Sequence, residues 1–318
     1  MTTRNRKCRL IIDSCCDLPA DLVKTFDVEG VLSLTYIMDD GDHPDDLWKT
    51  MTPHEFYERL RKGERSTTSQ VPPGDIQNLF TKVAKEGVPT VYLCFSSGLS
   101  GTYAGAKAIW NDMKSDYPDF ELHIVDSKLA SAAAGLLVIE AVRQCDQGLT
   151  AAELAAWIRE ARYYVHGYFT LASLETLQRG GRIPDMAGVV GSKLDIKPIL
   201  SFDLEGNLSF FAFARGRKKA IKHMIQTFEE RFDDYGPGDV LIASADAPKE
   251  QKSIAEQVQK SQHKTKIQHT SVGPVIGAHV GPEMLAIVFW GPDRRQYKSL
   301  ADRIARAVSG KRNSPGEE

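Results

Sequence analysis

The stretch TVYLCFSSGLSGTYAGAKAIW, residues 90–110, places a short apolar run, a turn of serines and glycines, and an amphipathic segment in direct succession. Residues 90–95 are rich in β-branched and aromatic side chains and too few for a buried helix, so they predict an interior strand. A helix is predicted to follow, because apolar side chains recur at helical spacing at Tyr103, Ala106, Ile109 and Trp110. A strand-to-helix turn directs free N–H groups and a positive helix end at one point, so residues 96–101 predict an anion site.

The first half of the chain repeats this alternation of strand and helix. Two capping boxes mark helix starts, Thr52–Glu55 and Thr150–Glu153, and proline follows Thr52 at the first helical position. Continuous apolar strands separated by helices are typical of a parallel sheet that is covered on both faces. The predicted strands span 8–13, 30–37, 90–95 and 122–126, and the predicted helices include 19–26, 52–63 and 74–87.

The pattern changes near Tyr164. Residues 165–173 predict a strand, and Glu205–Asn207 predicts the tight turn of a hairpin between two further strands. Additional strands are expected at 239–245 and 266–273, with a helix between them. These elements indicate an α+β arrangement with a mixed or antiparallel sheet.

We therefore expect an α/β protein of two domains. A parallel α/β domain with hydroxyl-rich turns is expected over residues 1–164, and an α+β domain over 165–305. The polar, turn-rich residues 306–318 are expected to be disordered.

Composition and charge exclude several classes of protein. Lysine plus arginine total 40 against 42 acidic residues, a net charge of −2, so no overall field would recruit nucleic acid. The N-terminal segment lacks the apolar core of a signal peptide, and no run approaches the roughly 18 apolar residues of a membrane span. The five cysteines show no metal-ligand spacing and are interpreted as buried or incidental thiols. A cytoplasmic protein without integral membrane contact is expected.

One basic cluster interrupts this neutral chain. Residues 214–223 hold Arg215, Arg217, Lys218 and Lys219 within a few positions. The cluster is either a solvated helix face or a docking surface for a partner, and the residues alone do not decide between the two.

Common catalytic and cofactor motifs are absent from the sequence. It has no G-x-x-x-x-G-K-[ST] phosphate loop, no G-x-G-x-x-G fingerprint and no histidine pair at zinc-ligand spacing. Neither a cofactor nor a metal is therefore expected. The G-x-S-x-G elbow of α/β hydrolases is also missing, but a base paired with Ser96 or Ser97 in another arrangement stays open.

Hydroxyl-rich turns are the remaining candidates for chemistry. Four of them stand next to predicted strands or helices, at Asp13–Ser14, Ser66–Ser69, Ser96–Ser97 and Asp126–Ser127. Each alone reads as a helix N-cap. Because ligands collect beyond the carboxyl ends of parallel strands, several such turns together predict a site for a carboxylate or phosphate.

Two basic side chains of the second half have similar settings. His279 stands in a segment, residues 271–283, that is interpreted as a glycine-rich loop, where it is equally a structural residue or a ligand. Arg182 follows two glycines, and its simplest interpretation is a solvent-facing residue after a helix end.

Nearly the whole chain, from Leu10 to about Trp290, resembles the DegV family, the fatty-acid-binding subunits of bacterial fatty acid kinase. The matching segments occur in the family's order. They are IIDSCCDLP, TSQVPPGD, SSGLSGTYAGA, VDSKLASAAAG, TLQRGGRI, LDIKPIL with EGNL, RGRKKA and GPVIGAHVGPE. The combination of SSGLSGTY, TSQ and GGRI is specific.

The resemblance implies a two-domain protein that holds one long-chain fatty acid and presents it to a separate ATP-dependent kinase subunit. By the same resemblance, Thr68, Ser97 and His279 would hold the carboxylate, and the acyl chain would lie in an apolar tunnel. Ser69, Ser96 and Arg182 are assigned to the same ligand site, and Arg215, Arg217 and Lys218 to the reacting end or to kinase docking. The chain itself would not be an enzyme.

The sequence departs from the family pattern at two places. Cys15–Cys16 replace residues that are commonly small, and Glu283 stands where the family usually has glycine, close to His279. Two alternative functions stay open. One is a hydrolase or acyltransferase with Ser97 as nucleophile and His279 as base, and the other is a carrier of a different anionic lipid or metabolite.

Overall fold

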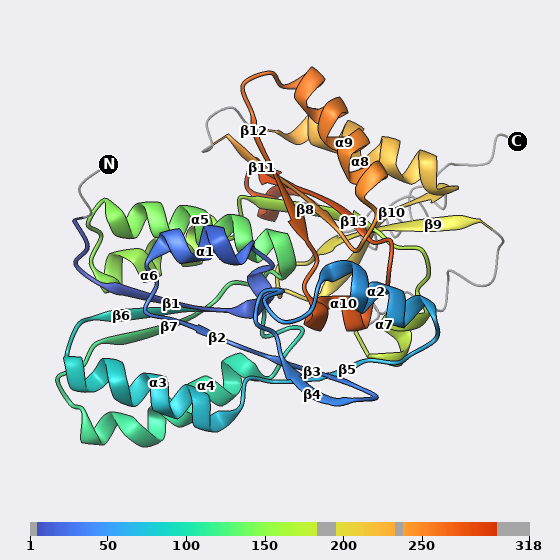
Figure 1. Cartoon of the computed structure of the whole chain (residues 1–318). Coiled ribbons are helices and arrows are strands. Elements are labelled where there is room, and N and C mark those ends of the chain that lie inside the picture. The colour runs from blue at the N-terminus through green and yellow to red at the C-terminus, as the bar shows by residue number, and fades with distance from the viewer. Residues whose placement is uncertain (1–4, 183–194, 233–237, 298–318) are drawn as a thin grey trace, which may run out of the picture.

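The computed structural model describes residues 5–182, 195–232 and 238–297. Within them, two main sheets lie next to one another, and a third sheet of three short strands extends beside them (Figure 1). Helix α5 (Ser131–Asp146) packs against strands of both main sheets. The expected α/β class, with one parallel and one mixed sheet, is confirmed.

The first main sheet is parallel throughout, in the order β2-β1-β6-β7. All residues of β6 are buried, as expected for an interior strand. Helices α1, α5 and α6 cover one face, and α3 and α4 the other (Figure 1). The elements are β1 (Arg9–Asp13), β2 (Gly30–Leu32), β6 (Thr90–Cys94), β7 (Leu122–Asp126), α1 (Ala20–Phe26), α3 (Pro73–Glu86), α4 (Thr102–Met113) and α6 (Ala151–Ala161), with short 3₁₀ turns at η1 (Ser14–Cys16) and η2 (Lys114–Asp116).

The single strand predicted at 30–37 is in fact two strands in two sheets. After β2, the backbone N–H of Leu34 donates to Ser14 Oγ at 3.1 Å, and its carbonyl accepts from Asp45 N at 2.8 Å. Because these groups bond outside the parallel sheet, the chain leaves it. It then forms an antiparallel three-stranded sheet from β3 (Thr35–Met38), β4 (Gly41–Pro44) and β5 (Thr67–Ser69).

The second main sheet is mixed, in the order β10-β9-β8-β13-β11-β12, with β11 and β12 as its parallel pair. Its first strand begins at Val165, next to the expected domain boundary, although the division into domains itself stays a prediction. The predicted hairpin is confirmed, with Gly206 at φ 89° in its turn. The strands are β8 (Val165–Thr170), β9 (Ile196–Phe202), β10 (Leu208–Arg215), β11 (Asp239–Ser244), β12 (Lys266–Ser271) and β13 (Leu285–Trp290).

Helices α8 (Arg217–Arg231) and α9 (Pro248–Ser261) cover the outer face of this sheet (Figure 1). Both predicted capping residues are in place: Thr52 Oγ1 accepts from Glu55 N at 3.2 Å at the start of α2 (Pro53–Arg61), and Thr150 forms a complete capping box with Glu153. The remaining helices are α7 (Glu175–Arg179), α10 (Pro274–Val280) and the 3₁₀ turn η4 (Arg294–Gln296). The expected disordered tail, 306–318, lies outside the described residues.

Helix α5 is buried on nearly all sides. Its sequence, SAAAGLLVIEAVRQCD, is apolar all round, which is typical of a helix enclosed by protein. Gly135 permits its closest approach to η1, because a Cβ there would lie 2.4 Å from the carbonyl oxygen of Cys16. All five cysteines are buried and unpaired. No helix in the described parts of the chain is long and apolar enough to span a membrane.

Three carboxyl groups are buried near the end of β1. Asp13, Asp17 and Asp45 are each at most 3 % exposed. Burial raises the pKa of Asp13 and of Asp17 to about 7, and it raises the pKa of Asp45 well above its ordinary value, with the Asp17 charge adding to the effect. Oδ1 of Asp17 and Oδ2 of Asp45 have no hydrogen-bond partner among the described residues. These carboxyl groups therefore keep protons in the folded chain that the unfolded chain releases.

This difference predicts that stability falls as pH rises. The unfolded chain loses the protons of Asp13 and Asp17 near pH 4 and the folded chain only near pH 7, so the free energy of unfolding decreases over that interval. We expect Asp45→Asn to make the decrease in the free energy of unfolding smaller, because it removes a buried carboxyl group whose pKa is raised. Urea unfolding at several pH values measures it, with the exposed Asp42→Asn as control. Equal pH profiles for Asp45→Asn and the wild type would contradict the assignment.

Candidate functional site

A cavity of about 350 Å³ lies where the two main sheets and the three-stranded sheet meet. Its lining comes from β5, β8, β13, the first residues of α5, helix α10 and the turn before α4. These segments range from Leu34 to Val288 in the sequence. The cavity therefore exists only in the folded arrangement of both halves of the chain.

Polar side chains from three separate segments gather at one end of this cavity. Thr68 on β5 and His279 on α10 form a hydrogen bond of 2.8 Å between Oγ1 and Nε2. Arg182 follows α7 and lines the same cavity, and its Nε donates to the carbonyl of Leu99 at 3.3 Å. Ser100, next to Leu99, is a further lining hydroxyl. The structure thus brings Thr68, His279 and Arg182 together, as the sequence analysis expected of the ligand site.

His279 lies on a helix, which corrects the expectation of a glycine-rich loop. Pro274 occupies the first turn of α10, and Gly273 and Gly281 flank the helix at its two ends. Gly277 permits tight packing, because a Cβ there would lie 2.6 Å from the hydroxyl of Tyr57. The glycines of this segment serve helix ends and close contacts, and the helix holds His279 in a fixed direction.

The electrostatics of this end favour neutral donors beside one cation. Burial, together with the positive charge of Arg182, lowers the pKa of His279 to about 4. The imidazole is therefore uncharged at neutral pH and can donate one hydrogen bond. Its Nδ1 is buried and has no partner among the described residues. Thr68, Ser100 and neutral His279 together offer hydrogen bonds to an anion, and Arg182 supplies charge.

The remainder of the lining is mostly apolar, with Ser69, Gln70 and Ser131 as its polar members. It comes from β8, β9 and β13 and from Ala130–Ala133 at the start of α5, and includes Phe169, Phe202 and Val288. The sequence analysis did not single out these residues, because an apolar side chain that lines a cavity has the same pattern as one in a core. The arrangement suits a ligand with an anionic head and a long apolar body.

Ser96 and Ser97 lie outside the residues that line the cavity. Ser96 is buried, and its hydroxyl donates to the carbonyl of Gly206 at 2.8 Å, which joins the turn to the β9–β10 hairpin. The exposed Ser97 accepts from Lys128 Nζ at 3.1 Å through its hydroxyl. Neither serine contacts His279 in these bonds, and their assignment to the ligand stays a prediction.

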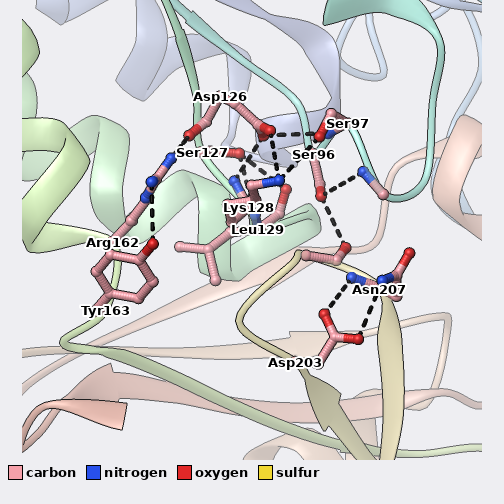
Figure 2. A network of polar contacts seen from close by, with 12 residues as sticks. Ser96, Ser97, Asp126, Ser127, Lys128, Leu129, Arg162, Tyr163, Asp203 and Asn207 are labelled. Carbon is pink, nitrogen blue, oxygen red and sulfur yellow. Dashed lines mark hydrogen bonds and ion pairs between the residues drawn. The ribbon is translucent and has the colours of Figure 1, made fainter. Parts of the chain in front are cut away.

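Backbone N–H groups at the edge of the parallel sheet already donate hydrogen bonds to carboxylates of the chain itself. Asp126 Oδ1 accepts from the backbone N–H groups of Ser97 and Lys128, at 3.1 and 3.0 Å (Figure 2). Asp13 Oδ2 accepts in the same way from Phe95 N at 2.5 Å. Of the four predicted hydroxyl turns, only Ser66–Ser69 contributes residues to the cavity lining.

The second half of the turn at 96–101 reaches the cavity instead. Leu99, Ser100 and Gly101 line it, and a Cβ on Gly101 would lie 2.5 Å from Nε2 of Gln70. Ser69, which the sequence analysis assigned to the ligand site, lines the cavity beside Gln70. Ser100 was missed, although the glycines Gly98 and Gly101 near it in SGLSGT signal a close backbone approach.

The basic cluster divides into two kinds of residue. Arg217 is committed within the protein, because its guanidinium pairs with Glu250 at 2.7 Å and donates to the carbonyl of Glu283 at 2.7 Å. Arg215 and Lys218 are exposed. Glu283 has a φ of 65°, in the left-handed region that favours glycine, which accounts for the family's usual residue there.

One group of possible metal ligands occurs in the described residues, His54, Glu58 and Asp246. Arg61 already forms ion pairs with Glu58 at 2.8 Å and with Asp246 at 2.5 Å. The guanidinium thus places one positive charge beside both carboxylates without a metal.

Comparisons with known proteins agree along the chain. Residues 7–291 match a family model described as an uncharacterised protein family, DegV. A DegV domain-containing protein of Clostridium perfringens is 35 % identical over 286 residues, which cover 90 % of this chain and 98 % of that protein. Both comparisons extend across the two main sheets.

Solved structures show the same fold. A DegV lipid-binding protein of Thermotoga maritima is similar with a TM-score of 0.75 and 27 % identity, over 91 % of this chain and 99 % of that one. DegV of Bacillus subtilis, described as a fatty-acid-binding protein, is similar with a TM-score of 0.77 and 26 % identity, over 90 % and 99 %.

The electrostatics of His279 can be tested directly. In an NMR titration of the imidazole protons, we expect His279 to titrate near pH 4. Arg182→Gln is expected to move this midpoint upward, because it removes the positive charge that disfavours the imidazolium. Arg179→Gln, an exposed arginine at the end of α7, serves as the control. If Arg182→Gln leaves the titration midpoint of His279 unchanged, Arg182 does not act on His279 and is not part of the site.

Proposed function

The chain belongs to the DegV family, and from this membership and its cavity we propose that it binds one long-chain fatty acid. In this proposal the carboxylate lies at Thr68 and His279, with Ser100, Ser69 and Arg182 beside it. The acyl chain extends along β8, β13 and the start of α5. The observation that carries the proposal is the Thr68–His279 pair, beside Arg182, in a cavity whose lining is mostly apolar.

The acyl tail and the carboxylate head contribute differently to the binding free energy of the fatty acid. Burial of about 15 methylene groups at roughly 0.8 kcal/mol each contributes on the order of 12 kcal/mol before the entropic cost of binding. The head-group donors add less affinity, but they fix which end of the ligand enters first. Solved DegV structures described as lipid-binding and fatty-acid-binding support a fatty acid as the ligand.

Ser96 and Ser97 contribute through the turn that carries Ser100. Ser96 ties that turn to Gly206, and the backbone N–H of Ser97 ties it to Asp126 (Figure 2). In this proposal the two serines therefore position a lining segment, and their effect on binding is smaller than that of Thr68.

The hydrolase alternative receives less support from the geometry. A serine nucleophile needs its base within hydrogen-bond reach. His279 Nε2 instead bonds to Thr68, and the hydroxyl of Ser97 bonds to Lys128. The arrangement favours a binding site over a Ser–His catalytic pair.

We further propose that a separate kinase phosphorylates the bound acid. A carboxylate oxygen would attack the γ-phosphorus of ATP to give an acyl phosphate and ADP. The sequence has no phosphate-binding loop of the common kinds, so the nucleotide would come with the partner. The exposed Arg215 and Lys218 are proposed as the docking residues, and the buried thiols suit a reducing cytoplasm.

The binding proposal is tested with released ligands and one conservative variant. Mass spectrometry of small molecules from the denatured, purified protein is expected to find long-chain fatty acids. Thr68→Val keeps the shape of the side chain but removes one donor, so we expect a 5- to 150-fold weaker affinity for oleate, from a cost of about 1–3 kcal/mol. Methyl oleate should bind the variant and the wild type about equally.

Ser66→Ala, in the same segment but outside the cavity lining, is the matched control and should bind oleate like the wild type. If Thr68→Val weakens the affinity for oleate and for methyl oleate equally, Thr68 does not bind the carboxylate. A purified protein that neither carries nor binds any fatty acid would overturn the proposed function.

The docking proposal calls for charge reversal. Arg215→Glu combined with Lys218→Glu is expected to slow kinase-dependent phosphorylation and to weaken its dependence on salt, because surface charges steer association. Oleate binding should persist. Arg217 is left unchanged because it pairs with Glu250. Loss of oleate binding in the double variant would place these residues in the fold or the cavity instead.

A further inference from the structure

We propose that Val165 and Trp290 close the apolar end of the cavity and thereby set the length of the acyl chain that fits. This inference rests on the proposed function, since it concerns the tail of the same ligand. It assigns the limit on acyl chain length to two residues.

Paired residues of β8 and β13 form successive rows along the cavity wall. Phe169 pairs with Ala286, Gly167 with Val288, and Val165 with Trp290. Side chains of alternate residues point to the same face of a strand. The members of these rows that have side chains all belong to one hydrophobic core, whereas the intervening Tyr168 and Ile287 belong to the core on the opposite face. The three rows therefore face the cavity side of the sheet in order.

The rows differ in their contact with the cavity. The rows of Phe169 and of Gly167 line it, and Val165 and Trp290 do not. Strand β8 runs toward α7, after which Arg182 stands at the polar end. The row of Val165 and Trp290 is thus the one farthest from the polar end, and the cavity stops in front of it.

Gly167 keeps the second row open. A Cβ at this position would lie 3.3 Å from Cβ of Ala133 on α5 and 3.3 Å from Cε2 of Phe202 on β9. That spacing is tighter than ordinary packing, so a side chain here would displace the Phe202 ring or the helix. Glycine therefore lets the cavity continue to Val288 between the helix and the sheet.

Trp290 fills the space beyond. Its side chain is 6 % exposed and packs near Trp157 of α6, with ring centroids 6.4 Å apart. The indole Nε1 has no hydrogen-bond partner among the described residues, so the ring acts there through its volume. The strand end is held in place, because Gly291 N donates to the carbonyl of Tyr164 at 2.9 Å. A large aromatic ring on a fixed backbone makes a firm end to the cavity.

The size of the expected effect follows from strand geometry. One row to the next spans about 6.8 Å, the length of roughly five methylene groups in an extended chain. Each methylene that gains or loses burial changes the dissociation constant by about four-fold. A shift of the cavity end by part of one row is therefore measurable.

Two variants move the end in opposite directions. Val288→Phe fills the second row, and we expect the optimum chain length to shorten, with at least a ten-fold loss for stearic acid relative to lauric acid. Trp290→Leu opens the third row, and the optimum is expected to lengthen toward behenic acid. Dissociation constants for a saturated series from lauric to behenic acid are measured for both variants and the wild type, after thermal melts show that each variant is folded.

Phe289→Leu is the matched control, because it shortens an adjacent aromatic side chain that faces the opposite core. It should keep the wild-type optimum. Unchanged optima in the folded variants would overturn this inference while fatty acid binding stands, and so would an equal shift in Phe289→Leu. If Val288→Phe does not fold, Trp290→Leu alone decides. A wild type that binds none of the acids would overturn the proposed function and this inference together.

Discussion

The hydroxyl of Ser131 donates to the carboxyl group of Asp17, and this buried contact determines where α5 begins between the two main sheets. Ser131 has a φ of 54°, so the chain turns sharply before the helix. One turn later, Gly135 lets α5 approach the carbonyl of Cys16. With the helix start held in this way, Ala130–Ala133 form one wall of the cavity. The cost is a buried carboxyl group whose pKa is raised to about 7.

The cavity also requires the helices that line it to keep their positions relative to the second main sheet. Arg143 on α5 pairs with Asp239 on β11 at 2.6 Å, and Asp239 is only 1 % exposed. The hydroxyl of Tyr57 donates to the carbonyl of Val272 at 2.7 Å, just before α10. Removal of one partner from such buried contacts leaves a polar group unpaired, which is costly. The Tyr57 bond holds the start of α10, and hence His279, opposite Thr68.

Local sequence signals predicted many elements well. The strand at 122–126, the N-cap at Thr52 and the capping box at Thr150 are where the pattern placed them, because their determinants are neighbours in the chain. The strand predicted at 30–37 was wrong as a single element. Its division depends on Ser14 and Asp45, which come close only after folding. Helix α10 was missed for a related reason, since its glycines mimic a loop while they serve close packing.

The sequence by itself determined the order of strands and helices, the hairpin turn at Gly206 and the family, because each depends on local pattern or on motifs in fixed order. Tertiary structure decided which hydroxyls reach the cavity. Ser97 and Thr68 stand in equally polar segments, yet the backbone N–H of Ser97 bonds to Asp126, whereas Thr68 faces His279. The row of Gly167 and Val288 is likewise indistinguishable from core in the sequence. Such choices depend on strand register and helix position, which bring together residues more than a hundred positions apart.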